Sequence, residues 1–192
     1  MFRHLFSKKI LVNIFFCILI SKCAFSENNL VIEVGGEASG KIEITLLPDL
    51  APLHVERIKT LVNLGAYNGV VFHRVIDDFM AQTGDGQYGS LKRGFQSDRV
   101  GMGGSELADL EAEFSSEPFV RGIVGMARSQ NPNSANSQFF IMLQDSMHLN
   151  NQYTVWGKVL KGMDVVDKIK KGDQLDNGKV DDPDFIKTTK NA

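Results

Sequence analysis

Three polar side chains lie within strongly apolar segments and could together form a binding site. Arg74 lies in the stretch FHRVI, Gln82 in FMAQTGD and Gln138 in SQFFIML. Taken singly, an arginine in an apolar strand is most often a surface residue whose stem lies along the protein. Together, a guanidinium and two amides beside Phe and Met are typical of an apolar pocket with a few oriented hydrogen-bonding groups. Such a pocket suits a small molecule or a peptide.

The alternation of side chains along a strand predicts which residues share a face. The polar groups and their large apolar neighbours are expected on one surface: Phe72, Arg74 and Ile76 in the first strand, Met80 and Gln82 in the second, and Gln138, Phe140 and Met142 in the third. The opposite face of the third strand carries Phe139, Ile141 and Leu143. We assign Phe139 to the core.

Metal and nucleotide chemistry find little support. Residues 84–89 read GDGQYG and match a dinucleotide-binding fingerprint, but no helical apolar pattern follows, and the fingerprint requires a helix to begin there. His54, His73 and His148 are far apart and have neither Cys partners nor HExxH spacing. We expect His54 to be a surface residue of a helix. The sequence therefore predicts no metal and no cofactor.

Hydrolytic chemistry is not indicated either. No GxSxG motif is present, and no serine has a marked base nearby in the sequence. The acidic pairs at 77–78 and 181–182 are adjacent to turn-forming or apolar residues and are interpreted as solvated turn charges. A reaction at the polar cluster would thus have to proceed without a nucleophile.

The elements that must position the cluster are short. Seven runs rich in Val, Ile and Phe predict strands at 30–34, 41–47, 70–76, 79–83, 122–126, 138–143 and 154–159. Helices are predicted over 49–65, where Pro52 lies in the first turn, and over 163–170. Seven or eight strands with two helices favour a mainly β fold, a closed antiparallel β-barrel capped by the helices. Residues 86–118 are polar and Gly-rich, typical of a long ordered loop that serves a binding site.

The first 26 residues have the layout of a secretory signal peptide. A basic start precedes an apolar run over 10–20, and small residues at Ala24 and Ser26 offer a cleavage site before Glu27. The 11-residue run is short of the roughly 20 residues that a membrane-spanning helix needs. An uncleaved membrane anchor is the alternative. A lipoprotein attached through Cys23 is disfavoured, because Lys22 stands where a small residue is expected.

Removal of residues 1–26 leaves one domain, 27–192, with a net charge of −6, since four of the 21 Lys and Arg and none of the 23 Asp and Glu lie in the leader. An acidic chain is a poor partner for nucleic acid. Both cysteines, Cys17 and Cys23, are removed with the leader, so the mature chain tolerates an oxidising compartment. We expect a periplasmic or secreted monomer that binds neither nucleic acid nor membrane.

The motifs FHRVI, FMxQxGD and SQFFI, with GMGGS between the last two, resemble those of the cyclophilin-type peptidyl-prolyl cis-trans isomerases. The resemblance extends from residue 30 to residue 189. It implies an eight-stranded antiparallel barrel with two capping helices, and an isomerase activity that needs no cofactor.

Site residues follow from the matched motifs. The resemblance implies that Arg74 is catalytic. It implies contacts with the substrate for Phe79, Met80, Gln82, Gly101, Ala127, Arg128, Gln138, Phe140, His148, Leu149 and Tyr153. Within this set, Ala127 and Arg128 offer backbone groups, and Leu149 and Tyr153 close the proline pocket. Three positions depart from the family pattern: Arg128 replaces an Asn, Tyr153 replaces a His, and His148 replaces the Trp of cyclosporin-sensitive members.

The implied substrates are proline-containing segments of exported proteins that are unfolded or still folding. An Arg at position 74 suits the reaction, because a guanidinium remains charged and can donate to the proline nitrogen as the peptide bond twists. A different reading also remains open. The domain could be a non-catalytic module, or a holdase chaperone, that grips proline-containing segments without isomerising them.

Overall fold

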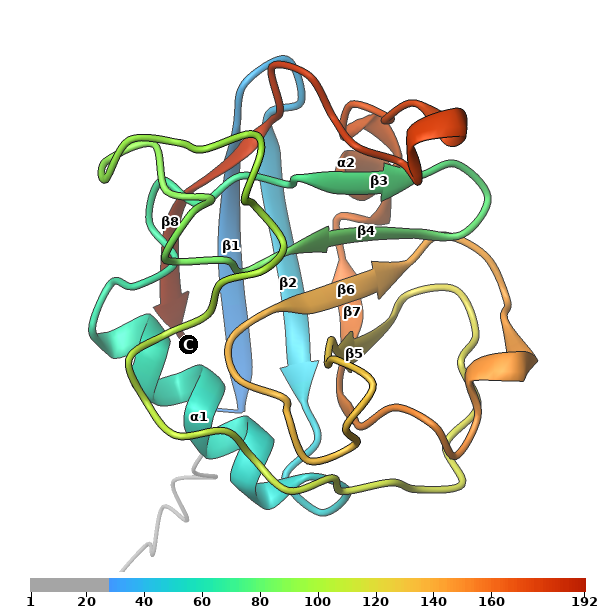
Figure 1. Cartoon of the computed structure of the whole chain (residues 1–192). Helices are drawn as coiled ribbons and strands as arrows, with labels where there is room; N and C mark the ends of the chain where they lie inside the picture. The colour runs from blue at the N-terminus through green and yellow to red at the C-terminus, as the bar shows by residue number, and fades with distance from the viewer. Residues whose placement is uncertain (1–27) are drawn as a thin grey trace, which may run out of the picture.

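The computed structural model describes residues 28–192, so the predicted signal peptide at 1–26 lies outside the described residues. One antiparallel sheet of eight strands dominates the fold, in the order β3-β4-β6-β5-β7-β2-β1-β8 (Figure 1). The strands are β1 (Asn29–Gly35), β2 (Gly40–Leu46), β3 (Arg74–Ile76), β4 (Met80–Thr83), β5 (Ile123–Met126), β6 (Phe139–Met142), β7 (Val155–Lys161) and β8 (Phe185–Asn191). The helices are α1 (Pro52–Asn63) and α2 (Met163–Lys168), with short 3-10 helices η1 (Met147–Leu149) and η2 (Gln174–Asp176).

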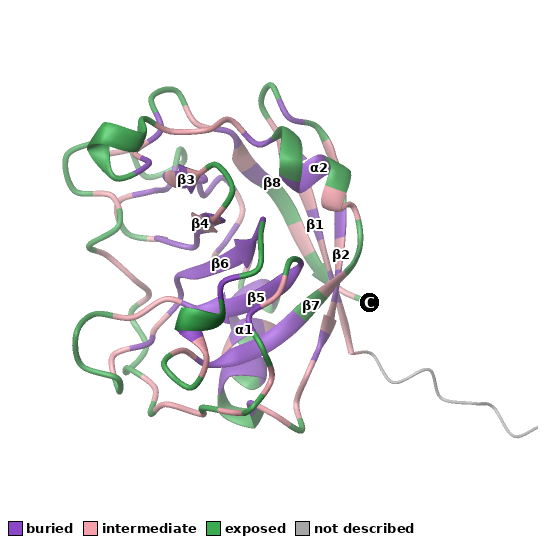
Figure 2. Ribbon diagram, turned by 90° about the vertical axis from the view of Figure 1, so that its right-hand side faces the viewer, coloured by how far each residue is buried: buried purple, intermediate pink, exposed green. Residues whose placement is uncertain are grey.

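The sheet has apolar side chains on both faces where it borders the site. In β6, Phe139 and Ile141 pack in the main core, while Phe140 and Met142 join a second cluster with Met80. All of β5 and β6 is therefore buried (Figure 2). The two faces predicted for this strand are confirmed. Phe72 is a correction: it packs in the main core, because it precedes β3 and does not follow the alternation of that strand.

The predicted closed barrel is wrong in one respect. The sheet is a curled half-barrel that is open between its edge strands β3 and β8. Of the predicted strand 70–76, only Arg74–Ile76 pair with β4. The residues before it hydrogen-bond instead with the start of β8, through Phe72 N to Asp184 O and Ile186 N to Val70 O, both at 2.8 Å. A short loop, rather than a ladder of paired strands, therefore spans the gap.

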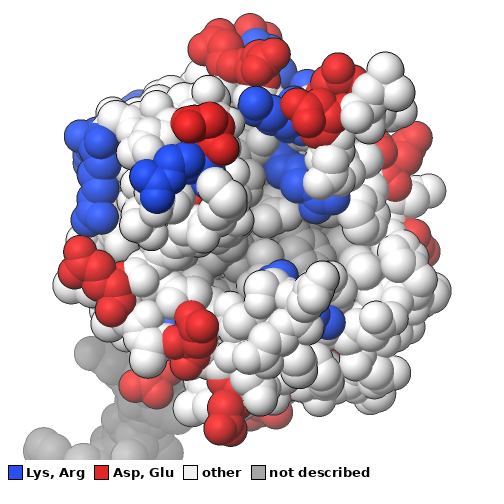
Figure 3. Space-filling view, in the orientation of Figure 1, with Lys and Arg blue, Asp and Glu red and all other residues white. Residues whose placement is uncertain are grey.

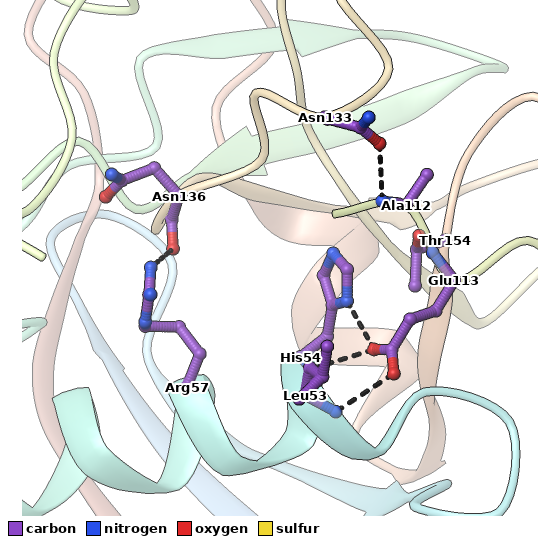
Figure 4. Close-up of polar contacts among 8 residues, drawn as sticks. All are labelled: Leu53, His54, Arg57, Ala112, Glu113, Asn133, Asn136 and Thr154. Carbon is purple, nitrogen blue, oxygen red and sulfur yellow. Dashed lines mark hydrogen bonds and ion pairs between the residues drawn. The ribbon is translucent and has the colours of Figure 1, made fainter. Parts of the chain in front are cut away.

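Helix α1 is capped by a residue from far along the chain. No side chain at its own N-terminus caps it, but the carboxylate of Glu113 accepts hydrogen bonds from Leu53 N at 3.1 Å and His54 N at 3.0 Å (Figure 4). The same carboxylate contacts His54 Nδ1 at 2.6 Å. Here the prediction of a surface His54 is wrong, because its side chain is fully buried beneath the 86–118 loop segment that carries Glu113. Burial lowers the pKa of His54, and Glu113 opposes that shift.

The remaining elements lie within a few residues of the predicted bounds: both helices are shorter than predicted, whereas β1 and β7 are longer. One strand was not predicted. That strand is β8, whose apolar pattern is weak, because only Ile186 is buried and five polar residues follow it. Residues 86–118 form no helix and no named strand, as expected of a loop. None of the helices within residues 28–192 is long and apolar enough to cross a membrane.

Candidate active site

A row of hydrogen bonds joins the three polar side chains identified in the sequence. Arg74 lies opposite Gln82 in the register of β3 and β4. Arg74 Nη1 donates to Gln82 Oε1 at 3.2 Å, and Gln82 Nε2 donates to Gln138 Oε1 at 2.9 Å. Gln138 immediately precedes β6, the other neighbour of β4. The adjacent strands β3 and β4 and the residue just before β6 thus each contribute one polar group to the row.

The long loop supports the far end of this row. Gln138 Nε2 donates to Gly101 O at 2.9 Å and to Gly103 O at 2.8 Å. Asp85, which is fully buried, accepts from Gly101 N at 2.8 Å and Gly103 N at 3.0 Å with one oxygen. Its other oxygen accepts from two backbone N–H groups at 87 and 88. Charge-assisted bonds of this kind are strong, so Asp85 fixes the loop against which Gln138 is oriented.

The other side of Arg74 contacts a loop near the C-terminus. Arg74 Nε donates to Asn177 O at 3.0 Å, and Nη2 donates to Asn177 Oδ1 at 2.9 Å. Nη1 also lies 3.8 Å from Met80 Sδ. The guanidinium is therefore held from two directions, by β4 and by the loop after η2.

A cavity of about 270 Å³, lined by both apolar and polar side chains, lies beside the row. It is lined by Arg74, Phe79, Met80, Gln82, Ala127, Arg128, Phe140, Leu149 and Tyr153. Figure 3 shows a hollow on the face that carries β3, β4 and β6, with basic atoms at its margin. A mixed lining of aromatic and aliphatic groups beside an oriented guanidinium is typical of a site for a small apolar ring.

Aromatic packing shapes the wall of this cavity. The ring of Phe140 stacks on the buried Phe119 at 5.8 Å and meets Tyr153 edge-on at 5.6 Å between centroids. Gly125 leaves the room for this arrangement, since a Cβ there would lie 2.5 Å from the Phe140 ring. Any larger residue at 125 would push Phe140 out of place.

A second cavity of about 220 Å³ adjoins the first and shares Gln82, Ala127 and Arg128 with it. Its other lining residues are Gly101, Met102, Gly103, Ser129, Ser134, Asn136 and Gln138. Gly101 has a φ of +95°, in the region that favours glycine. The two cavities are thus adjacent parts of one cleft, an arrangement that suits an extended peptide better than a single small ligand.

Two predicted residues have a more specific placement. His148 does not line either cavity but stacks on Phe79, with ring centroids 5.9 Å apart. The Arg128 side chain lies over Tyr153 at 4.6 Å and donates to Gln152 O, so it reinforces the rim. The other predicted site residues all line one cavity or both.

Comparison with known proteins assigns this chain to a family. The model of the family described as "Cyclophilin type peptidyl-prolyl cis-trans isomerase/CLD" matches residues 30–191. The chain belongs to this family. It is therefore a cyclophilin-type peptidyl-prolyl cis-trans isomerase.

Related sequences and structures agree with this assignment. A protein of Brucella suis named "Probable peptidyl-prolyl cis-trans isomerase" is 60% identical over 166 residues, covering 86% of this chain and 83% of its own. The crystal structure of cyclophilin AquaCyp293 from Hirschia baltica superposes with a TM-score of 0.69 at 26% identity, covering 86% of this chain and 74% of that one. A Cryptosporidium parvum cyclophilin crystallised in the presence of the dipeptide Ala-Pro shares the fold, with a TM-score of 0.71 at 24% identity over 85% of this chain and 98% of that one.

Burial shifts the pKa values of two neighbouring residues in this cyclophilin, His73 and Arg74. Partial burial lowers the pKa of the Arg74 guanidinium, which still leaves it a cation at physiological pH. His73, directly before it, is 4% exposed, and burial lowers its pKa to about 4. It is therefore neutral at pH 7 and adds no positive charge behind Arg74. Within residues 28–192, no three His, Cys, Asp or Glu side chains gather where they could hold a metal ion.

Sequence reasoning missed Asp85, Asn177 and Phe119. Asp85 and Phe119 touch the site only through other residues, and neither has a local pattern that marks it as buried. The Asn-Gly pair at 177–178 signals a turn. Nothing in the sequence links that turn to Arg74, which lies 103 residues earlier.

Proposed function

We propose that the cleft of this cyclophilin binds extended proline-containing segments of other proteins, with the proline ring in the 270 Å³ cavity beside Arg74. The observation that carries the proposal is the position of the guanidinium, which lines the same cavity as Met80, Phe140 and Leu149. The Ala-Pro dipeptide used with the Cryptosporidium parvum cyclophilin supports a proline ligand for this fold.

In the proposed mechanism, the site binds the half-rotated X–Pro bond more tightly than it binds either planar form. Turning a peptide bond breaks amide resonance, at a cost of roughly 18–20 kcal/mol, and an X–Pro bond isomerises alone in tens to hundreds of seconds. At the half-turned state the proline nitrogen regains a lone pair. A hydrogen bond from Arg74 to that nitrogen stabilises the twisted state more than either planar state, and only such differential binding accelerates the reaction.

Gln82 has two tasks in this proposal. Its Oε1 accepts from Arg74 and one amide hydrogen is directed at Gln138, which leaves the second amide hydrogen for a substrate carbonyl. The apolar side chains hold the pyrrolidine ring while the residue before it rotates. No metal or covalent intermediate takes part in these steps.

We further propose that the protein acts outside the cytoplasm, on exported proteins as they fold. This rests on the three-part pattern of residues 1–26 and on the absence of Cys after residue 26. Mass spectrometry of the protein from the producing cells tests it. Cleavage after Ser26 is the expected result, and an intact N-terminus in the cytoplasmic fraction would overturn it.

The catalytic proposal is tested by following cis-to-trans conversion of proline peptides with the purified protein. We expect acceleration over the uncatalysed rate, and a loss of that acceleration in Arg74→Ala with the fold intact. An Arg74→Ala variant as active as the wild type would reject the role assigned to Arg74.

A further inference from the structure

The guanidinium of Arg74 has an acceptor that the sequence motifs do not include. Asn177 meets it twice, through its backbone oxygen at 3.0 Å from Nε and through Oδ1 at 2.9 Å from Nη2. Both bonds lie on the edge of the guanidinium that faces away from Gln82. The two atoms of one residue therefore fix both the position and the plane of the group.

The loop that carries Asn177 is itself tied to β3. Val75 N donates to Gly178 O at 2.8 Å, and Gly172 N donates to Val75 O at 2.9 Å. Asp173 closes the loop, because its backbone oxygen accepts from Gly178 N at 2.7 Å. Arg74 and its acceptor thus belong to one hydrogen-bonded unit, although the acceptor comes from the C-terminal part of the chain.

The backbone of Asn177 has a strained conformation that serves this contact. Its φ is +53°, in the left-handed region that glycine and asparagine adopt most readily. Glycine at 177 would accept the same φ and keep the backbone oxygen, but would lack Oδ1. The side-chain bond can therefore be removed without disturbing the turn.

A count of donors shows what this contact leaves for a substrate. A guanidinium has five N–H donors. Nε and one N–H of Nη2 are directed at Asn177, and one N–H of Nη1 is directed at Gln82. Two N–H groups remain for other acceptors. One is the second N–H of Nη2, and the other is the second N–H of Nη1, which has only a long contact with Met80 Sδ. The contacts with Asn177 and Gln82 thus leave one edge of the guanidinium free for a substrate.

We propose that Asn177 is a positioning residue for the isomerisation, which holds the guanidinium of Arg74 so that its free edge faces the twisting bond. The proposal rests on the catalytic role of Arg74 given under Proposed function. Pre-set geometry matters most at the transition state, where small misplacements cost large factors in rate. Loss of Oδ1 should therefore lower kcat and leave KM nearly unchanged.

The test compares Asn177→Gly with wild type and with Gln174→Ala, an exposed residue of the adjoining helix η2. For Asn177→Gly we expect about a tenfold fall in kcat, with KM within twofold and an unchanged thermal midpoint. Gln174→Ala should match the wild type. Asn177→Gly with wild-type kcat would overturn the proposal, as would a loss that appears only in KM.

A double-variant cycle separates positioning from a general effect on the fold. If Asn177 acts through Arg74, Asn177→Gly has no further effect in the Arg74→Ala background. A tenfold loss in both backgrounds would contradict the proposal and indicate a structural role instead. The Arg74→Ala variant alone tests the proposed function. If this variant retains full activity, the catalytic role of Arg74 is wrong. If Arg74→Ala loses most of its activity while Asn177→Gly keeps wild-type activity, only the role of Asn177 is wrong.

Discussion

Arg74 and Gln82 are directly opposite each other in the β3–β4 hairpin, and their side chains are hydrogen-bonded at 3.2 Å. The hairpin turn sets this pairing, with Asp78 in the left-handed region at a φ of +54°. A slip of one residue would turn the side chains of a strand to its other face. The site thus depends on the register of a short hairpin as much as on the identity of its residues.

The buried carboxylate of Asp85 should be required for a stable loop. Asp85→Asn replaces one of its oxygens by an amide that cannot accept from the two N–H groups now bound there. Because unsatisfied buried groups are costly, we expect the free energy of unfolding to fall by roughly 2–3 kcal/mol. Urea titration measures it, with the exposed Asp98→Asn as the matched control. Equal stability of the two variants would contradict this assignment.

Glu113 should stabilise helix α1 from outside the helix. Glu113→Ala removes the acceptor of Leu53 N and His54 N, and loss of an N-terminal cap costs about 1–2 kcal/mol. The comparison is with Glu111→Ala, an exposed glutamate in the same loop segment, by chemical denaturation. The idea fails if both substitutions have the same small effect.

His73 should make the fold less stable in mild acid. Its pKa is about 4 in the folded state against 6.5 unfolded, so the unfolded chain binds the proton first as the pH falls. The stability that the fold gains by keeping His73 neutral is therefore complete above pH 6.5 and is lost progressively towards pH 4. From pH 6.5 to 4.5 this amounts to roughly 2 kcal/mol.

Denaturation of wild type and His73→Phe at both pH values measures this contribution. The expected result is a smaller loss of stability in His73→Phe over the same interval, because His54 and the carboxylates still contribute. Since the readout is the change with pH, the absolute stability of the variant does not affect it. Identical pH dependence in the two proteins would show that His73 does not titrate in this way.

Because of His148, we expect this protein to bind cyclosporin more weakly than family members with Trp at this position. This residue occupies the position at which the cyclosporin-sensitive members that the chain resembles have Trp, and here its smaller ring stacks on Phe79 at 5.9 Å. We expect His148→Trp to tighten inhibition at least tenfold, because a larger aromatic surface becomes available. Inhibition assays on both proteins provide the measurement, and nanomolar inhibition of the wild type would contradict the prediction.

Much of the site was predictable because its strands carry local patterns. The alternation in SQFFIM correctly separates Phe140 from Phe139, and the three polar residues of adjacent strands do form one row. The sequence failed where position depends on distant parts of the chain. The sequence around His54 fits an exposed helix face, but the distant segment with Glu113 covers this residue in the fold. Asn177 contacts Arg74 only because its loop pairs with β3. The closed barrel failed for a similar reason: residues 70–72 fit a strand pattern, but they make only isolated contacts with the start of β8 and no continuous ladder across the gap.

The most direct test of the account is the effect of Arg74→Ala on turnover and on affinity, measured in one protein with a proline peptide. Removing a donor aimed at the transition state is expected to lower kcat/KM by about 10²–10³, with peptide affinity within a few-fold of the wild type. Turnover equal to the wild type would contradict the account. So would a variant that loses peptide affinity in proportion to its activity, which would instead favour a module that only grips proline-containing segments.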